Sequence, residues 1–353
     1  MHRKTVICMI ALIALALFIV VSCGKEESDT EEDKSNVAGG WKISVVDDQG
    51  TPGSPNRIAL NSSGDPVIAY YDSDNQAIRI AFWEDGWEVE TILEGGVEGG
   101  VDMVLVNDNP NVIYCAGGLW LAVLQSNGSY QKTQLDPENG CVNSVAADDN
   151  GNIYVAAYIN ATNNLKYYTN RDSEEHVFAG YVAVDGASGV KDVAISASPG
   201  GRPFIAYATS NVFWGTTTQA IWDFSQIGSG EYVSQTTDGS EGAYVFGAGE
   251  DGLTFYSLSV EGDNDSVSVT GEQVTWPSIH IGTSGRIHGS FTLNGAVYYA
   301  TEVDSKWEAD GVVVEVGDGA YSSVTSNDAD DAFIAFLDTK TGRLLHVTNK
   351  DDF

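Results

Sequence analysis

The stretch GDPVIAYYDSDNQAIRIAFWEDGW (Gly64–Trp87) decides the fold. It contains three hydrophobic runs separated by two short polar turns, at 72–76 and 84–86. Runs of this length, rich in β-branched and aromatic residues and bounded by Asp, Asn and Gly, are typical of successive antiparallel strands. Similar stretches return at intervals of roughly 35 to 50 residues, which is the spacing of a repeat array. The sequence therefore predicts an all-β protein built from one repeated unit.

Seven copies of the second strand of this unit can be aligned. They read PVIAYYD (66–72), NVIYCAG (111–117), IYVAAYI (153–159), PFIAYAT (203–209), TFYSLS (254–259), IHGSFTL (287–293) and AFIAFLD (332–338). Each follows an apolar strand that ends in a tight turn, and third and fourth strands come after it. This count predicts a seven-bladed β-propeller over residues 40–353. The fifth unit has only about 16 residues between Ser259 and Trp276 by the numbering, so it could hold three strands only.

The fourth strand indicates how the ring closes. Trp87 and Trp307 begin fourth strands, and Trp41 lies at the same offset from the next inner strand. The unit after Arg343 lacks a fourth strand of its own. Residues 41–46 are therefore predicted to supply the outer strand of the last blade, which would leave no long exposed sheet edge in the ring.

The N-terminal segment has the pattern of an export signal. His2-Arg3-Lys4 is followed by the apolar run Val6–Val21, which is short for a membrane span, and by Val20-Val21-Ser22-Cys23. These last four residues resemble a bacterial lipobox. The resemblance implies a signal peptide at 1–22, lipidation of Cys23, and a location at the bacterial outer membrane or cell surface. Residues 23–39 are acidic and nearly free of apolar side chains, so we expect a disordered tether.

The charge of the chain restricts its partners. Acidic residues outnumber basic ones 50 to 17, and 15 basic residues remain once Arg3 and Lys4 are removed with the leader. The resulting net charge of −35 repels nucleic acids and anionic lipid headgroups. We expect a monomer that contacts the membrane through its lipid anchor only, with a glycan, a peptide or an envelope protein as partner.

A family resemblance adds to this picture. The segments AYYD (69–72), AYAT (206–209), LKYYT (165–169) and VDGASG (184–189) resemble the sialidase-type propeller repeats of secreted bacterial proteins. The resemblance implies a propeller scaffold rather than a reaction, because one scaffold hosts hydrolases, lectins and assembly platforms. The chain has no S-x-D-x-G-x-x-W Asp-box, and no pattern identifies an arginine triad with a tyrosine nucleophile.

Candidate residues gather where blade loops are expected to meet at one mouth of the ring. Asp72 and Asp338 occupy the same position of blades one and seven, and Arg57 begins a nearby inner strand, so the three could perform acid–base chemistry. An Asp that opens a tight turn also caps its own backbone, which explains both carboxylates without catalysis. The mouth loops further contain aromatic and amide side chains suited to sugar or peptide binding, although blade packing would use the same residues: Tyr71, Asn211, Trp214, Trp276 and Tyr321.

Metal binding has weak support. His280 and His288 lie on adjacent predicted strands, but no third ligand is near them in the sequence, so structural histidines are favoured. The segment Gly262–Ser266 offers oxygen ligands for Ca²⁺ but lacks EF-hand spacing, and a solvated turn explains it equally well. No cofactor is predicted. Cys115 and Cys141 could form a disulfide between blades two and three, or remain two separate buried thiols.

Three functions are compatible with these features. The first is a non-catalytic binding lipoprotein whose propeller mouth contacts a glycan, a peptide or a partner protein. The second is a sialidase-like glycan hydrolase or lyase, which needs Arg57, Asp72 and Asp338 to converge near a tyrosine. The third is an envelope-assembly platform that uses the blade edges. No common nucleophile, phosphate or metal motif is present, so the first function is favoured.

Overall fold

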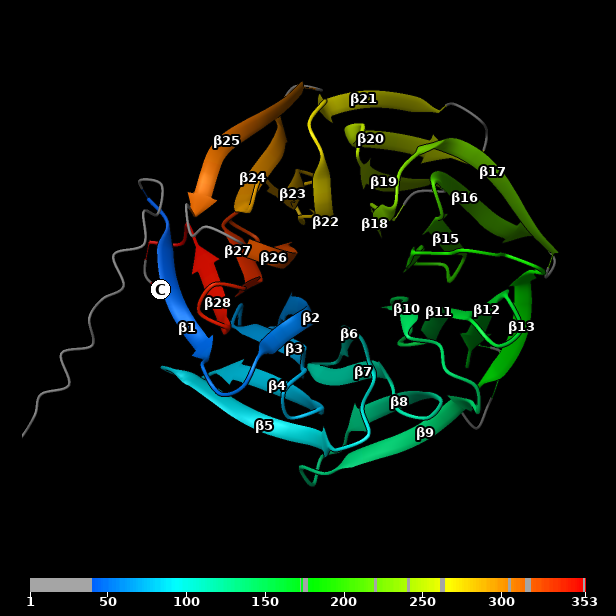
Figure 1. Ribbon diagram of the computed structural model, residues 1–353, viewed down its shortest axis with the longest axis horizontal. Coiled ribbons are helices and arrows are strands. Elements are labelled where there is room, and N and C mark those ends of the chain that lie inside the picture. Colours follow the sequence, from blue (N-terminus) through cyan, green and yellow to red (C-terminus); the bar gives the residue numbers. More distant parts are fainter. Residues whose placement is uncertain are drawn as a thin grey trace, which may run out of the picture. The chain divides into compact units, whose positions relative to one another are not determined.

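The computed structural model describes residues 40–171, 173, 177–218, 221–239, 242–260, 264–303, 306–314, 319–351 and 353. All of them belong to one compact unit, Asn36–Phe353. Within this unit, seven four-stranded antiparallel sheets surround a central axis (Figure 1). The predicted all-β, seven-bladed propeller is therefore confirmed. The predicted signal peptide, Cys23 and tether lie outside the described residues, and no described helix is long and apolar enough to cross a membrane.

The strands are numbered in chain order, and each blade begins with its innermost strand. Blade 1 contains β2 (Pro52–Leu60), β3 (Pro66–Asp72), β4 (Ala77–Trp83) and β5 (Trp87–Glu94). Blade 2 contains β6 (Gly99–Val106), β7 (Asn109–Cys115), β8 (Leu119–Leu124) and β9 (Tyr130–Asp136). Blade 3 contains β10 (Val142–Ala147), β11 (Ile153–Ile159), β12 (Asn164–Thr169) and β13 (Ala179–Val184). Blade 4 contains β14 (Asp192–Ala197), β15 (Pro203–Ala208), β16 (Asn211–Thr218) and β17 (Ile221–Ser229).

The last three blades follow the same plan. Blade 5 contains β18 (Tyr232–Thr236), β19 (Gly242–Gly249), β20 (Gly252–Ser259) and β21 (Asp265–Thr270). Blade 6 contains β22 (Val274–Ile281), β23 (Ile287–Leu293), β24 (Ala296–Val303) and β25 (Lys306–Val314). Blade 7 contains β26 (Gly319–Ser326), β27 (Ala332–Asp338), β28 (Arg343–Thr348) and, from the other end of the chain, β1 (Lys42–Asp47).

Two details of this order bear on the sequence predictions. Strand β1 pairs with β28, with Ile43 opposite Val347 and Val45 opposite Leu345, so the N-terminal segment does complete the last blade. The expectation that blade 5 might hold three strands is wrong. Strand β21 pairs with β20 as an outer strand, and it fits because only five residues separate the end of β20 at Ser259 from its start at Asp265.

The hydrophobic core lies between neighbouring blades. The second strands are almost entirely buried, as in β11 and β27, because both faces of each pack against an adjacent sheet. One cluster combines Ile78 and Ile80 of blade 1 with Met103 and Val112 of blade 2. Each blade therefore depends on its neighbours for burial, and the ring gains full stability only when it is closed.

A buried ion pair joins the last blade to the first. Asp47, at the end of β1, accepts hydrogen bonds from Arg79 of β4 at 2.9 Å and from the Tyr70 hydroxyl at 2.7 Å. The other terminal guanidinium nitrogen of Arg79, Nη2, lies 3.1 Å from the Oδ2 atom of Asp72. The same device recurs between blades 2 and 3, where Asp136 ends β9 and accepts from Lys166 and Tyr168, each at 2.6 Å. These carboxylates fix the outer strand of one blade to the interior of the next.

Because the ion pair between Asp47 and Arg79 is buried, we expect its loss to lower the free energy of unfolding. Asp47→Ala should lower the free energy of unfolding by about 3 kcal/mol, because it removes one partner of a buried pair and leaves the Tyr70 hydroxyl without its acceptor. Urea denaturation measures this change, with Asp48→Ala at the exposed neighbouring position as the control. Equal effects of the two substitutions would show that Asp47 does not lock the ring.

Candidate binding site

A cavity of about 310 Å³ lies on the central axis, where the innermost strands begin. Every blade contributes two or more residues to its wall, from Pro55–Arg57 in blade 1 to Tyr321–Ser323 in blade 7. The sequence analysis predicts that the loops between blades meet at one mouth of the ring, and the cavity lies where the inner strands begin. The volume is at the lower end of the range of about 300–1,000 Å³ that small-ligand pockets occupy.

Backbone bulges shape the rim of the cavity. The inner strands β2, β6, β22 and β26 each change register against their neighbours just before the cavity. At the bulges of β22 and β26, Trp276 and Tyr321 have φ angles of 47° and 55°. Large side chains rarely adopt this left-handed region, which costs about 1–2 kcal/mol per residue, and such residues cluster at functional sites. The equivalent residue of β6 is Gly100, where an added Cβ would strike the backbone of Cys141.

The bulged residues form part of an aromatic wall across three consecutive blades. The rings of Trp276 and Tyr321 lie 4.6 Å apart between centroids, and the ring of Tyr232, which begins β18, lies 6.0 Å from that of Trp276. All three are partly exposed and line the cavity. Burial raises the pKa values of Tyr232 and Tyr321, so both phenols stay neutral. The wall is therefore an uncharged, electron-rich surface.

The floor of the cavity is held by hydrogen bonds that run from each blade to the next. Four inner strands present a serine hydroxyl that accepts a backbone N–H of the following blade: Ser144 from Ile195 (3.3 Å), Ser234 from Ile279 (3.0 Å), Ser278 from Val324 (3.0 Å) and Ser323 from Ile58 (3.1 Å). Asp102 and Asp192 take this role in blades 2 and 4, toward Val145 and Val233, both at 2.9 Å. At the remaining junction, Arg57 lies 3.4 Å from Asp102.

The two aspartates differ in their surroundings. Asp102 is 8% exposed and also accepts hydrogen bonds from Met103 and from the Ser144 hydroxyl, in addition to its contact with Arg57. Among the described residues, the hydrogen-bond donors to Asp192 are the backbone N–H groups of Val193 and Val233, each at 2.9 Å. Burial raises the pKa of Asp192 to about 7, and the nearby Asp102 carboxylate contributes to the rise. Asp192 therefore changes charge near neutral pH.

The structure places only part of the predicted site at this cavity. Arg57 lines it as expected, but the proposed trio with Asp72 and Asp338 does not form. Asp72 is fully buried against Arg79 and accepts the backbone N–H of Asn75, while Asp338 accepts from the Lys340 backbone and the Thr341 hydroxyl. Both carboxylates cap their own turns, which is the alternative that the sequence left open.

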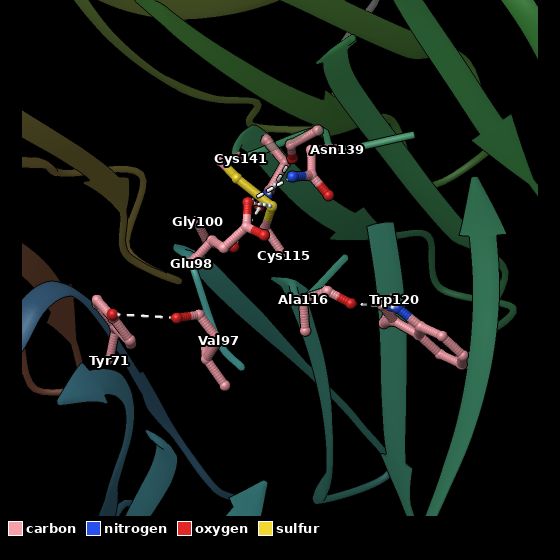
Figure 2. The surroundings of a disulfide bond; sticks show 11 residues. Tyr71, Val97, Glu98, Gly100, Cys115, Ala116, Trp120, Asn139 and Cys141 are labelled. Carbon is pink, nitrogen blue, oxygen red and sulfur yellow. Dashed lines mark hydrogen bonds between the residues drawn. A yellow bond between two sulfur atoms is a disulfide. The ribbon is translucent and has the colours of Figure 1, made fainter. Parts of the chain in front are cut away.

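The predicted binding residues divide in the same way. Trp276 and Tyr321 face the cavity, whereas the other three do not line it. The Tyr71 hydroxyl donates to the carbonyl of Val97 at 3.2 Å, and Asn211 accepts from Gln226 at 3.2 Å (Figure 2 shows Tyr71). Trp214 is 8% exposed and stacks on Phe204 within the core of blade 4. It lies within the third strand, β16, rather than in a loop at the mouth.

A disulfide joins two blades beside the cavity. Cys115 ends β7 in blade 2, and Cys141 precedes β10 in blade 3; their Cα atoms are 5.1 Å apart and their sulfur atoms are bonded (Figure 2). Glu98 lies next to them and accepts a hydrogen bond from the Asn139 amide. The three side chains Glu98, Cys115 and Cys141 are close enough to suggest a metal site, but sulfurs bonded to each other are not thiolate ligands.

Among the described residues, neither the histidine pair nor the proposed calcium loop belongs to a group of three close metal-ligating side chains. His280 lies opposite His288, and burial lowers the pKa of His280 to about 3, so it stays neutral. The Nδ1 atom of His288 is 2.6 Å from the Tyr299 hydroxyl, as expected of a structural histidine. In the proposed calcium loop, Gly262 and Asp263 lie outside the described residues, and the Asn264 side chain accepts the backbone N–H of Ser259.

Sequence reasoning missed most residues of the cavity, among them Asp102, Asn143, Asp192 and Tyr232. One signal was available. In most units a short polar residue stands directly before a buried apolar residue within the inner strand, as in Asp102-Met103, Ser144-Val145 and Ser323-Val324. Aligning the inner strands on this position would have brought the lining residues into one column.

The disulfide predicts a measurable contribution to stability. Replacing both Cys115 and Cys141 by Ala should lower the free energy of unfolding by about 3 kcal/mol, because the bond closes a loop of 26 residues in the unfolded chain. Thiol titration checks the bond itself: the denatured, unreduced protein lacking residues 1–23 should show no free thiol. Two free thiols would contradict the bond.

Comparisons with known proteins agree with the architecture. A model of the beta-propeller repeat SBBP matches residues 142–166, which cover β10, β11 and the start of β12. No curated protein matches the chain. Among solved structures, virginiamycin B lyase from Staphylococcus aureus is similar, with 11% identity, a TM-score of 0.63, and coverage of 87% of this chain and 98% of the lyase.

Two lectins are also similar. SapL1 lectin, solved in complex with alpha methyl fucoside, has 12% identity and a TM-score of 0.53, and the match covers 75% of this chain and 98% of the lectin. Aleuria aurantia lectin has 13% identity and a TM-score of 0.50, with coverage of 76% and 97%. At these identities the similarity concerns the fold alone: the chain carries a beta-propeller repeat and folds as a seven-bladed propeller.

Proposed function

We propose that the protein is a lipid-anchored, non-catalytic binding protein of a bacterial cell envelope, and that its mouth cavity holds a sugar ring. The observation that carries this proposal is the aromatic wall of Tyr232, Trp276 and Tyr321 in a cavity that also contains charged and amide side chains. Sugar rings have an apolar face that stacks on aromatic rings and hydroxyl groups that need hydrogen-bond partners.

The polar part of the cavity suits a ligand with several hydroxyl groups. The amide nitrogens of Asn56 and Asn143 donate to the carbonyls of Tyr321 (2.7 Å) and Gly100 (2.8 Å), which fixes both side chains. Within the described residues, the oxygens of the same two amides have no hydrogen-bond partner. Buried acceptors of this kind are costly unless a donor reaches them, and a ligand hydroxyl or a water could supply one after a small shift of the amides, because both oxygens are almost inaccessible in this arrangement.

The arrangement of the carboxylates supports binding over hydrolysis. A glycosidase needs two carboxyl groups on either side of the scissile bond, one of them free to act as an acid. Asp72 and Asp338 cap turns, and Asp102 is occupied by Arg57 and three hydrogen-bond donors, which leaves Asp192 as the single carboxyl group of the lining without an ion pair among the described residues. The hydrolase or lyase alternative therefore loses Asp72 and Asp338, and Asp192 alone does not supply the two carboxyl groups that hydrolysis needs.

Two further observations support the proposal. Lectins that share the propeller fold include one solved with a fucoside, so the scaffold can present a sugar site. The net charge of −33 for the whole chain disfavours nucleic acid as the partner. The anchoring part rests on the sequence Val20-Val21-Ser22-Cys23 and the acidic tether that follows it.

The stacking surface is tested by Trp276→Gly. Glycine adopts a φ of 47° without strain, so the backbone of the bulge is kept while the ring is lost. We expect the affinity for a bound sugar to fall at least tenfold, about 1.4 kcal/mol, in isothermal titration against a panel of methyl glycosides. The matched control is Tyr181→Ala, which removes an exposed aromatic ring of the outer strand β13. An unchanged affinity in Trp276→Gly would contradict the proposed site.

The anchor is tested by Cys23→Ser in the full chain. The substitution removes the thiol that would carry the lipid, so labelling of cells with a fatty-acid analogue should no longer mark the protein. Wild-type protein and Cys115→Ser, which both keep Cys23, are the controls, and both should be labelled. Undiminished labelling of Cys23→Ser would place the anchor elsewhere.

A further inference from the structure

We infer that the sugar held in the mouth cavity carries a cationic amine, and that the carboxylate of Asp192 is the partner of this amine. The inference rests on the proposed sugar-binding function and names the class of sugar. It follows from the pairing of charges inside the cavity, from the position of the aromatic wall, and from the charge of the whole chain.

Among the charged side chains that line the cavity, Asp192 differs from the others because they form ion pairs. Two cations line it, Arg57 and Lys191. Arg57 faces Asp102 at 3.4 Å, and Lys191 forms an ion pair with Glu231 at the rim. Asp192 is the remaining charged residue of the lining, and no lysine, arginine or histidine among the described residues forms an ion pair with it. A carboxylate in a confined site without a cation is electrostatically unfavourable, so a cationic ligand would be stabilised there.

The aromatic wall begins next to this carboxylate. Asp192 accepts the backbone N–H of Val233, the residue that follows Tyr232, and the charge of Asp192 acts on the Tyr232 phenol. An ammonium group bound to Asp192 would therefore lie near Tyr232, whose ring is 6.0 Å from that of Trp276. Aromatic faces attract cations through their electron density, and this attraction adds to that of the carboxylate.

The negative net charge of the chain also favours a positively charged ligand. Fifty acidic residues against 17 basic ones create a negative potential that attracts cations and repels sulfated, phosphorylated or carboxylated sugars. Arg57 and Lys191 could attract such anions in isolation, but each is already neutralised by its own carboxylate. An amino sugar with a free amine fits the cavity better than a neutral or acidic sugar.

Binding should then depend on pH. The charge of Asp102, from β6, acts on Asp192, and the charge of Asp192 acts on the phenol of Tyr232, from β18. The other charged residues of the lining are Arg57, from β2, and Lys191, the neighbour of Asp192 in the chain. Burial and Asp102 raise the pKa of Asp192 to about 7 in the empty protein, so the carboxylate loses its charge as the pH falls below 7. A ligand amine with a pKa of about 8 stays protonated over this range. Affinity should therefore fall between pH 7.0 and about 5.5, and the bound amine should lower the pKa of Asp192.

The test compares four probes on the folded propeller, residues 24–353, by isothermal titration at pH 7.0. The probes are the methyl β-glycosides of glucosamine, N-acetylglucosamine, glucose and glucuronic acid, which share one ring and differ in charge. We expect the glucosamine glycoside to bind at least about tenfold more tightly than the glucose and N-acetylglucosamine glycosides. This preference should shrink to about twofold at pH 5.5.

Variants separate charge from structure. Asp192→Asn should abolish the preference for the amine and its pH dependence, while Asp48→Asn, an exposed acid with the same change in net charge, should leave both intact. If Asp192→Asn does not fold, as judged by circular dichroism, Tyr232→Leu provides a second test. It leaves the carboxylate in place and should reduce the preference for the amine by removing the aromatic face.

Each outcome has one meaning. Equal binding of the glucosamine, N-acetylglucosamine and glucose glycosides overturns the inference but keeps the sugar-binding function. Tightest binding of the glucuronic acid glycoside overturns the inference and assigns the cavity to acidic sugars. A preference for the amine that persists in Asp192→Asn also overturns it. Absence of binding by all four probes at millimolar concentration contradicts both the inference and the proposed sugar site.

Discussion

The pairing of β1 with β28 is the contact on which the rest of the structure depends. It joins residues about 300 positions apart in the chain and gives blade 7 its outer strand. Each blade buries its apolar faces against its neighbours, so an open ring would expose the faces of two blades and an unpaired strand edge. The ion pair between Asp47 and Arg79 then fixes the closing strand to blade 1.

Closure also creates the cavity in which we propose that the ligand binds. The cavity is lined by all seven blades, and no single blade provides more than a small part of its wall. Hydrogen bonds from Ser323 to Ile58 and from Asp102 to Val145 connect the inner strands around the axis, so the spacing of the lining residues is set by the ring as a whole. A ligand in the cavity would contact residues far apart in the sequence, and its binding would be coupled to the integrity of the ring.

The same inner strands perform two tasks with different residues. Small polar side chains at the floor hold the blades together, while bulged residues at the rim, above all Trp276 and Tyr321, face the cavity with left-handed backbone angles. Such angles are unfavourable for large side chains, and the surrounding sheets must stabilise them. Rigid strands beneath such a rim favour binding, because little free energy is then lost in ordering the site when the ligand binds.

The sequence by itself determined the repeat, the number of blades and the N-terminal closure, because alternating apolar and polar residues and turn-forming Asn, Asp and Gly act locally and recur in every unit. It also identified Arg57, Trp276 and Tyr321 as residues near the mouth. Only the tertiary structure decided which side chains share the cavity. Asp72 caps a turn and Trp214 packs in the core, so neither lines the cavity. Asp102, Asp192 and Tyr232 line it instead. The reason is physical: bulges and register shifts of one or two residues decide whether a side chain faces the axis, and they arise from contacts between blades that no local pattern encodes.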